Sequence, residues 1–192
     1  ALAAIGTGTW TQQSGPGTLT FGMTANDPDQ TFTVDAYGAY VFRWTDVNGT
    51  CSDFDEITVN FFEDPTIAAA GSDLGQCNNS TFVMSANVPA VGTGTGSVQS
   101  GFAVTITNPT SATTTITGLT AGNSSTLRWT ISNGSCTDSF DDVVLTNDIQ
   151  PSADAHEPSG TTSFDECALT HTVDALAAIG TGTWTQQSGP GT

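Results

Sequence analysis

Thiols and carboxylates are the side chains of this 192-residue sequence that are best suited to chemistry. The four cysteines lack the C-x-x-C spacing of zinc sites, so they predict disulfide bonds rather than a metal centre. Disulfides in turn indicate an oxidising, extracellular compartment. Free buried thiols are the alternative. The cysteines are Cys51, Cys77, Cys136 and Cys167.

The two arginines are the only Lys or Arg residues, and a tryptophan follows each, in Arg43-Trp44 and Arg128-Trp129. Neighbouring side chains on a strand point to opposite faces, so we expect the tryptophans in the core and the arginines outside. The next expected strand begins with acidic residues, which predicts ion pairs that pin the two strands together. A ligand-binding arginine is the alternative. The expected acidic partners are Asp55, Glu56, Asp141 and Asp142.

Acidic clusters follow both arginine-containing strands, and several carboxylates in one loop could hold Ca²⁺, which takes about six to eight oxygen ligands. A solvated acidic loop is the alternative, since the sequence has no EF-hand pattern. No other cofactor is predicted. The candidate ligands are Asp53, Asp55, Asp138 and Asp141, and Glu63, Asp64 and Asp148 could assist them.

Catalytic residues are not predicted. His156 and His171 have no partners arranged for catalysis, and the nucleophile-elbow pattern G-x-S-x-G is absent from the sequence. We therefore expect a protein that is not an enzyme. Ser139, Asn79 and Asn123 are candidate glycosylation sites, the two asparagines because they lie in N-x-[ST] sequons.

The charge balance excludes several classes of function. The chain has 19 acidic residues against 2 Lys or Arg, for a formal net charge of −17, so we expect no binding to nucleic acid or to an anionic membrane. No apolar run approaches about 20 residues, so no membrane insertion is expected. An export signal, if any, would lie outside these residues.

Strand-forming residues and turn residues dominate the sequence, and no stretch keeps a helical period, so we predict an all-β fold. Between residues 65 and 150 about seven short strands separated by turns are expected, which is typical of a β-sandwich. The expected strands are residues 66–70, 81–86, 96–99, 103–107, 113–117, 125–132 and 142–147.

Internal repeats define the domain organisation. Residues 1–18 and 175–192 are identical (ALAAIGTGTWTQQSGPGT), at an offset of 174 residues, which predicts one period of a tandem array plus an overlap. A weaker repeat at half this period brings the Arg-Trp-Thr and Asn-Gly-[Thr/Ser]-Cys motifs back after 85 residues, and Gly-Thr-Gly-Thr at residues 6–9 back after 86 residues.

Prolines 65 and 151 mark the expected domain edges, because proline cannot continue a strand ladder. We therefore expect residues 1–64 to be the C-terminal part of one domain, residues 65–150 a complete domain, and residues 151–192 the N-terminal part of the next.

The repeat gives each domain one early and one late cysteine. It predicts a disulfide between Cys77 and Cys136 inside the complete domain, worth roughly 4 kcal/mol in the chain-entropy account. Cys51 is expected to pair with the counterpart of Cys167 in the preceding copy, and Cys167 with the counterpart of Cys51 in the following copy.

A fixed order of motifs runs through the repeat: an early Cys, Gly-Thr-Gly-Thr-Trp, a Thr-rich strand pair, Arg-Trp-Thr-x-x-Asn-Gly-[Thr/Ser]-Cys and an acidic cluster. This order resembles the PKD-like, immunoglobulin-like repeats of giant cell-surface adhesins in Bacteroidota, some of them associated with gliding motility and type IX secretion. Gly96 departs from the pattern, because it stands where Trp10 and Trp184 occur. The resemblance implies immunoglobulin-like β-sandwiches arranged as beads on a string, with a role in surface display or adhesion.

Two functions remain open from the sequence. The first is a structural or adhesive repeat that forms the stalk or filament of a giant secreted bacterial surface protein. The second is a carbohydrate-binding or spacer module of a secreted polysaccharide-degrading enzyme, with Trp10 and Trp184 as sugar-stacking platforms instead of core residues. The expected partners are neighbouring repeats, other copies bundled through exposed sheet edges, or surface polysaccharide.

Overall fold

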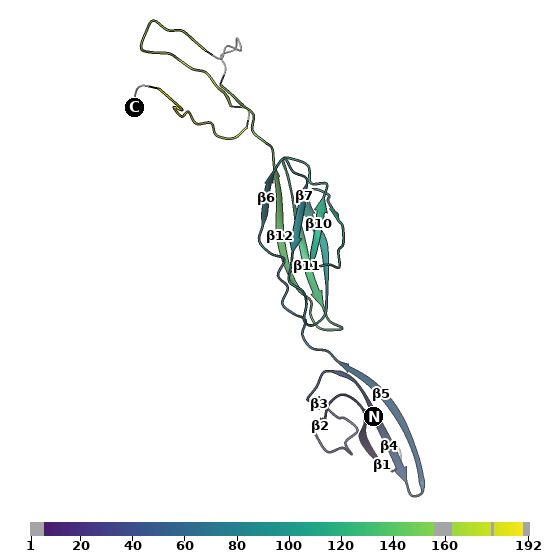
Figure 1. Cartoon of the computed structure of the whole chain (residues 1–192). Coiled ribbons are helices and arrows are strands. Elements are labelled where there is room, and N and C mark those ends of the chain that lie inside the picture. The colour runs from purple at the N-terminus through teal and green to yellow at the C-terminus, as the bar shows by residue number, and fades with distance from the viewer. Residues whose placement is uncertain (1–5, 156–162, 178, 190–192) are drawn as a thin grey trace. The chain divides into compact units, whose positions relative to one another are not determined.

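The computed structural model of the chain describes residues 6–155, 163–177 and 179–189. Every regular element in the described part of the chain is a β-strand, which confirms the all-β prediction (Figure 1). The chain divides into two compact units. The first comprises residues 1–68, 88–94 and 130–140, and the second comprises residues 69–87, 95–129 and 141–192. The described residues include no helix long and apolar enough to cross a membrane.

The first unit contains the N-terminal sandwich, which consists of strands β1 to β5. One layer is an antiparallel sheet in the order β1-β4-β5, formed by Thr7–Ser14, Gly38–Asn48 and Cys51–Phe61. The other layer pairs β2 (Leu19–Phe21) with β3 (Phe32–Val34). Aromatic residues of β1 and β4 form the core between the layers, and apolar residues of β2 and β3 pack against them. The buried core residues are Trp10, Tyr40, Phe42 and Trp44.

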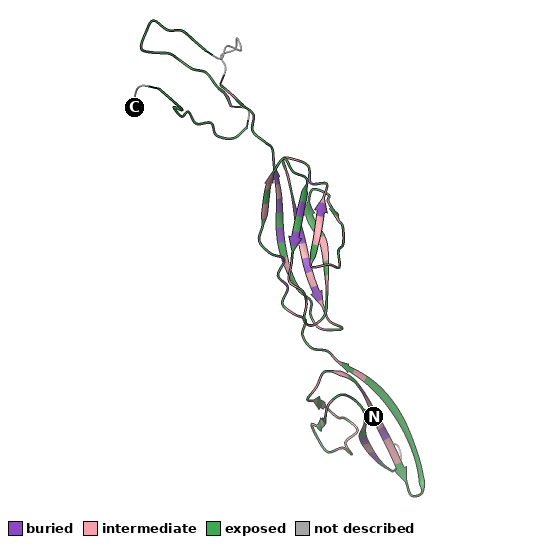
Figure 2. Cartoon of the chain, viewed as in Figure 1, coloured by how far each residue is buried: buried purple, intermediate pink, exposed green. Residues whose placement is uncertain are grey.

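Strand register determines which side chains of this sheet face the core. The ladder between β4 and β5 places Trp44 opposite Asp55 and Arg43 opposite Glu56. Alternation therefore directs the arginine and Glu56 to the outer face, and the tryptophan and Asp55 to the inner face. Most of β5 is nevertheless exposed, as its green colour in Figure 2 shows.

The central sandwich consists of strands β6 to β12, and most of its residues lie in the second unit. One sheet has the order β6-β12-β11-β8 and the other has the order β7-β10-β9. Apolar residues that alternate along these strands, such as Phe82 and Met84 on β7, are buried between them. The strands are Leu74–Cys77, Thr81–Ser85, Thr93–Gly101, Thr105–Ile106, Thr113–Thr117, Asn123–Ser132 and Ser139–Asp148.

One predicted strand of the central sandwich is wrong and one observed strand was missed. Residues 66–70 are extended without a ladder: the N–H groups of Ala68 and Ala70 donate to the side chains of Ser139 and Asp141, at 2.9 and 2.8 Å, instead of to another strand. The edge strand β6 pairs in parallel with β12. Its residues, LGQC, include a glycine and a glutamine, so strand propensity gave no signal for it.

The two sandwiches correspond element by element, with two exceptions. β1, β4 and β5 match β8, β11 and β12, and β2 and β3 match β9 and β10. Within residues 6–64 the structure has no counterpart of β6 or β7. The outer edges of β5 and β3, to which those strands would add, are therefore unpaired in the N-terminal sandwich.

The C-terminal segment has little regular structure in its described residues. Only β13 (Ala153–Asp154) and β14 (Leu176–Ala177) pair there. Trp184 is 59% exposed, whereas Trp10 in the identical sequence is 8% exposed, so the prediction of Trp184 as a core residue is wrong for this chain. Trp10 is covered by the rings of Phe32 and Trp44, and the 192 residues contain no second copy of the stretch that supplies them.

Candidate functional site

The two arginines lie on the outer faces of their sheets, each beside one acidic residue of the next strand. Arg128 donates from Nε and Nη2 to both carboxylate oxygens of Asp142, at 2.8 and 2.9 Å. Arg43 donates from Nε to Glu56 Oε1 at 2.8 Å, and its guanidinium lies 4.0 Å from the centre of the Phe54 ring. Each arginine thus forms an ion pair that links its strand to the next strand.

Of the four expected acidic partners, the two on the outer face of their strands bind an arginine and the other two do not. Asp55 and Asp141 do not pair with an arginine in the described contacts. Asp141 instead accepts the Ala70 N–H, and Asp55 faces the inner side of its sheet. Hydrogen bonding to Arg128 lowers the pKa of Asp142 below its ordinary value, and the same bonds raise the pKa of the arginine.

The calcium candidates are not gathered into one cluster. Among the described residues, no three carboxylate, imidazole or thiol side chains come close enough together to hold a metal ion. Asp53 and Asp55 lie on β5, two residues apart, and Asp138 directly precedes β12. Calcium binding remains a prediction for these loops.

The predicted disulfide between Cys77 and Cys136 is corrected by the structure, in which all four cysteines are free. Cys77 is in register with Asp148, the last residue of β12, whereas Cys136 precedes Ser139, the first residue of that strand. A strand of this length spans about 30 Å, and a disulfide requires Cα atoms within about 7 Å. The expected pairings of Cys51 and Cys167 involve neighbouring copies and stay predictions.

The candidate glycosylation atoms are largely engaged in hydrogen bonds. Ser139 Oγ accepts the Ala68 N–H, and Asn123 Nδ2 donates to Thr120 Oγ1 at 3.0 Å. The exposed side chain of Asn79 accepts the Thr81 N–H at 3.1 Å. His156 lies outside the described residues, and His171 Nδ1 lies 2.7 Å from Glu166 Oε1.

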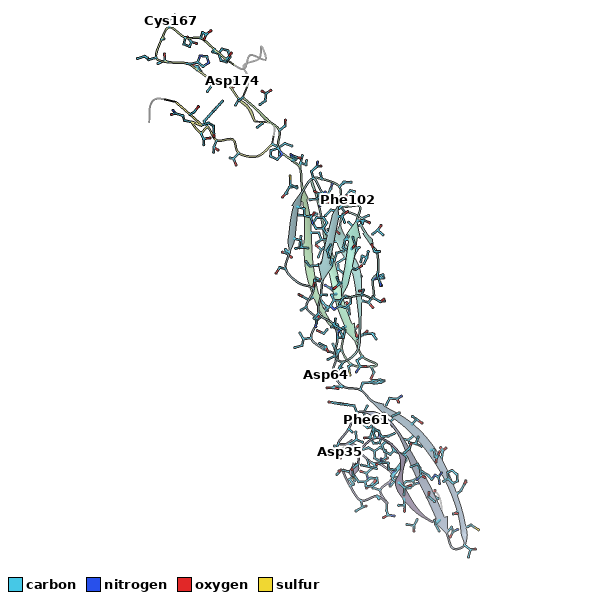
Figure 3. The ribbon with its side chains drawn as sticks, viewed as in Figure 1. Asp35, Phe61, Asp64, Phe102, Cys167 and Asp174 are labelled. Atoms are coloured by element: carbon cyan, nitrogen blue, oxygen red, sulfur yellow. The ribbon has the colours of Figure 1, made fainter. Side chains whose placement is uncertain are left out.

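The connecting segment, residues 62–68, lies in the first unit and is held by two turn segments of the same unit, residues 88–94 and 130–140. Asp64, labelled in Figure 3, belongs to this segment. Thr66 Oγ1 accepts the N–H groups of Ala90 and Val91, each at 2.9 Å, and the Thr66 N–H donates to the Val91 carbonyl at 3.1 Å. These bonds fix the middle of the connecting segment.

The Asn-Gly turn at residues 133–136 holds the start of the connecting segment. Asn133 Nδ2 donates to the Glu63 carbonyl at 2.8 Å, and Cys136 Sγ lies 3.4 Å from the same oxygen. Gly134 has φ +58°, and a Cβ at this position would lie 2.4 Å from the Phe62 ring. Only glycine therefore lets this ring lie against the turn.

We call this set of contacts the clasp. It joins the connecting segment to two turns that are remote in sequence, and no charge or metal is needed for it. The clasp is not predicted from the sequence, although Asn-Gly-[Thr/Ser]-Cys recurs in both halves of the period and is the one signal for it. Its members are Phe62, Glu63, Thr66, Ala68, Ala90, Val91, Asn133, Gly134, Cys136 and Ser139.

The N-terminal sandwich has an open hollow of about 880 Å³ beside its buried tryptophans. Trp10 Nε1, Trp44 Nε1 and Asp46 Oδ1, in three residues that line it, are buried without a hydrogen-bond partner. In the central sandwich the space beside Trp129 measures about 30 Å³, and Met84 of β7 is among the residues that line it. The hollow therefore lies where the missing counterpart of β7 would pack.

No family model matches the chain, and no curated protein matches it. Among solved structures it is similar to the extracellular domain of protocadherin gammaB4, at 14% identity and a TM-score of 0.36, over 88% of this chain and 34% of that one. Domains 4–9 of the surface layer protein SbsC match at 13% identity and a TM-score of 0.26, over 85% and 27% of the two chains. An endo-fucoidan hydrolase of glycoside hydrolase family 107 matches at 13% identity and a TM-score of 0.29, over 71% and 27%. The chain spans less than two thirds of each of these proteins.

Proposed function

We propose that this chain is part of a tandem array of immunoglobulin-like sandwiches that forms the extended stalk or filament of a large secreted cell-surface protein. The domain edges at residues 65 and 151 belong to the same proposal. The clasp is the observation that supports it: within the first unit, hydrogen bonds and a ring contact hold the connecting segment against two turns. A fixed linker lets successive domains add length instead of coiling.

The identity of residues 1–18 and 175–192 supports an array in which one period follows another without a change of spacing. The unpaired edges of β5 and β3 fit the same arrangement, because residues 151–174 precede the repeated stretch and would supply the two absent strands from the preceding copy. The net charge of −17 keeps such a surface soluble and mutually repelling.

The proposed partners are the neighbouring repeats of the same chain, with other copies or surface polysaccharide as further contacts. Assignment to a Bacteroidota gliding-motility adhesin rests on the motif resemblance alone. An extracellular location follows from the same proposal.

The test is electron microscopy of cells that make the parent protein, labelled with antibodies raised against this chain. Filaments decorated at regular intervals are expected. Label confined to the cytoplasm would overturn the proposal. Repeating the imaging with a calcium chelator tests the acidic loops, because filaments that collapse would assign structural Ca²⁺ to them.

A carbohydrate-binding or spacer module is the second candidate, and the hollow favours it because two tryptophans and several carboxylates line it. Aromatic rings of this kind can stack on sugars. A glycan array with the chain and its Trp44→Ala variant tests this idea. Binding that the variant loses, and that persists when residues 151–174 are placed before residue 1, would favour the module over the stalk.

A further inference from the structure

The early cysteine of the central sandwich lies at the end of the strand that leads out of that sandwich. Cys77 is the last residue of β6, and the parallel register places it beside Asp148, the last residue of β12. The next N–H along, that of Asn78, donates to the Asp148 carbonyl at 2.8 Å. Cys77 is exposed there. An early cysteine therefore marks the point where the chain leaves its sandwich.

The late cysteine lies against the point where the chain enters the sandwich. Cys136 Sγ is 3.6 Å from the Phe62 carbonyl oxygen and 3.4 Å from that of Glu63. Both carbonyls belong to the residues that directly follow β5, which ends at Phe61. Cys136 keeps part of its surface exposed.

These two positions are equivalent in the repeat. Phe62 and Asp148 each lie three residues before a domain-edge proline, and the offset between them is 86 residues. If a counterpart of β6 pairs with β5 as β6 pairs with β12, its cysteine lies beside Phe62. The N–H of the residue after that cysteine then donates to the Phe62 carbonyl. That carbonyl is the one that Cys136 already approaches. Cys167 of the preceding copy is the cysteine that this strand carries.

Two contacts indicate how near the two cysteines come, one observed at the Phe62 carbonyl and one at the equivalent Asp148 carbonyl. In the array the sulfur of Cys136 and the N–H after the early cysteine would share the Phe62 carbonyl oxygen, so that sulfur and that nitrogen would be no farther apart than the two distances added together. Disulfides join residues whose Cα atoms lie within about 7 Å. The two cysteines are thus placed beside the same carbonyl group, whereas the two cysteines inside one sandwich are a strand length apart.

We propose that the cysteines staple consecutive sandwiches to each other, an inference that rests on the tandem array proposed above. Cys136 bonds to Cys167 of the preceding copy, and Cys77 bonds to Cys51 of the following copy. Each bond forms when two thiols give up two protons and two electrons to a small-molecule disulfide such as oxidised glutathione, which leaves as two thiols. The staple closes each clasp covalently.

Two chains test the staple by peptide mapping after equilibration with oxidised and reduced glutathione. One is the 192-residue chain, and the other carries two periods, residues 1–174 followed directly by residues 1–192. In the two-period chain we expect peptides that link Cys77 to Cys51 and Cys167 to Cys136. The single chain lacks both partners, so its monomer should keep four free thiols.

Links between Cys77 and Cys136, or between Cys167 and Cys51, would overturn the proposal, and so would thiols that all stay free in a folded two-period chain. Circular dichroism confirms folding in each case. Replacing Cys136 by Ser in both copies should abolish only the Cys167 link and leave Cys77 bonded to Cys51. An intradomain pattern would instead release Cys77.

The same two-period chain separates failure of the staple from failure of the array. An extended particle in solution scattering with free or differently paired thiols refutes the staple and leaves the stalk intact. A collapsed or flexible particle that still shows the two expected links refutes the rigid stalk and leaves the cysteine assignment standing.

Discussion

Gly134→Ala should open the clasp without unfolding either sandwich. Any side chain at this position collides with the Phe62 ring, since a Cβ would lie 2.4 Å from it. Phe62 is 41% exposed, so the ring can swing into solvent and the turn can keep its backbone shape. The variant therefore loses a packing contact rather than a core residue.

The size of the effect follows from the area that Phe62 covers. A phenylalanine side chain buries about 200 Å² at most, and at about 25 cal/mol per Å² the part that Phe62 buries is worth up to about 3 kcal/mol. Loss of about half of that contribution would lower the free energy of local opening by about 1.4 kcal/mol. This corresponds to a tenfold rise in the open population.

Cleavage after Glu63 by a glutamate-specific protease measures this opening, because the Glu63 carbonyl is held by Asn133 in the closed clasp. When opening is faster than cleavage, the rate follows the open population. We expect the fragment that starts at Asp64 to appear about ten times faster from Gly134→Ala. Cleavage at Glu166, in the exposed C-terminal segment, serves as the internal reference for protease activity.

Gly49→Ala is the matched control. Gly49 has φ +62° in the corresponding Asn-Gly turn, so alanine costs about 1–2 kcal/mol of backbone strain at either site. No atom lies within 4 Å of a Cβ at Gly49. Equal cleavage rates for the two variants would refute the reasoning, because backbone strain rather than the ring contact would then explain the change.

Three further predictions concern the sandwiches. Asn147→Ala should lower the free energy of unfolding by about 2–4 kcal/mol, because the side chain is only 2% exposed and makes two hydrogen bonds. Asn60→Ala, on the exposed face of β5, should change the free energy of unfolding little. Equal melting temperatures for the two variants would contradict this prediction. Arg128→Gln should return the pKa of Asp142 toward its ordinary value in an NMR titration. The pKa of Asp142 is lowered in the folded state, so the ion pair stabilises the fold at pH values above the ordinary carboxylate pKa. This contribution is lost as the pH falls below about 4 and Asp142 becomes protonated. Over that pH interval the Arg128→Gln variant should therefore lose less stability than the unmodified chain. Placing residues 151–174 before residue 1 should fill the hollow, shift tryptophan emission to the blue and raise the melting temperature by about 5 °C or more; unchanged emission would argue against the proposed domain edges.

Local pattern was enough to predict most strands of the central sandwich. The run Thr113–Thr117 is a strand as expected, since β-branched residues fill it and turn residues flank it. Alternation also placed Trp44 and Trp129 in the core and the arginines outside. It could not decide which of two adjacent acids pairs with each arginine, because that depends on the register between strands.

Long-range geometry is what the sequence could not supply. The positions of Cys77 and Cys136 in the repeat suggested a pair, but sequence order does not reveal that β12 separates them along its whole length. The clasp was missed for the same reason: Phe62 and Gly134 meet only when a turn folds back on the connecting segment. Trp184 shows that even an identical sequence adopts a different burial when its partner strands are absent.

Small-angle scattering from chains of one, two and three periods tests the stalk most directly. A sandwich with ten-residue strands is about 33 Å long, so two sandwiches with their connecting segments should add roughly 70–80 Å per period to the maximum dimension. The account predicts that this dimension grows linearly with the number of periods. Growth that falls below proportionality, with the scattering of a flexible coil, would contradict a rigid clasped array.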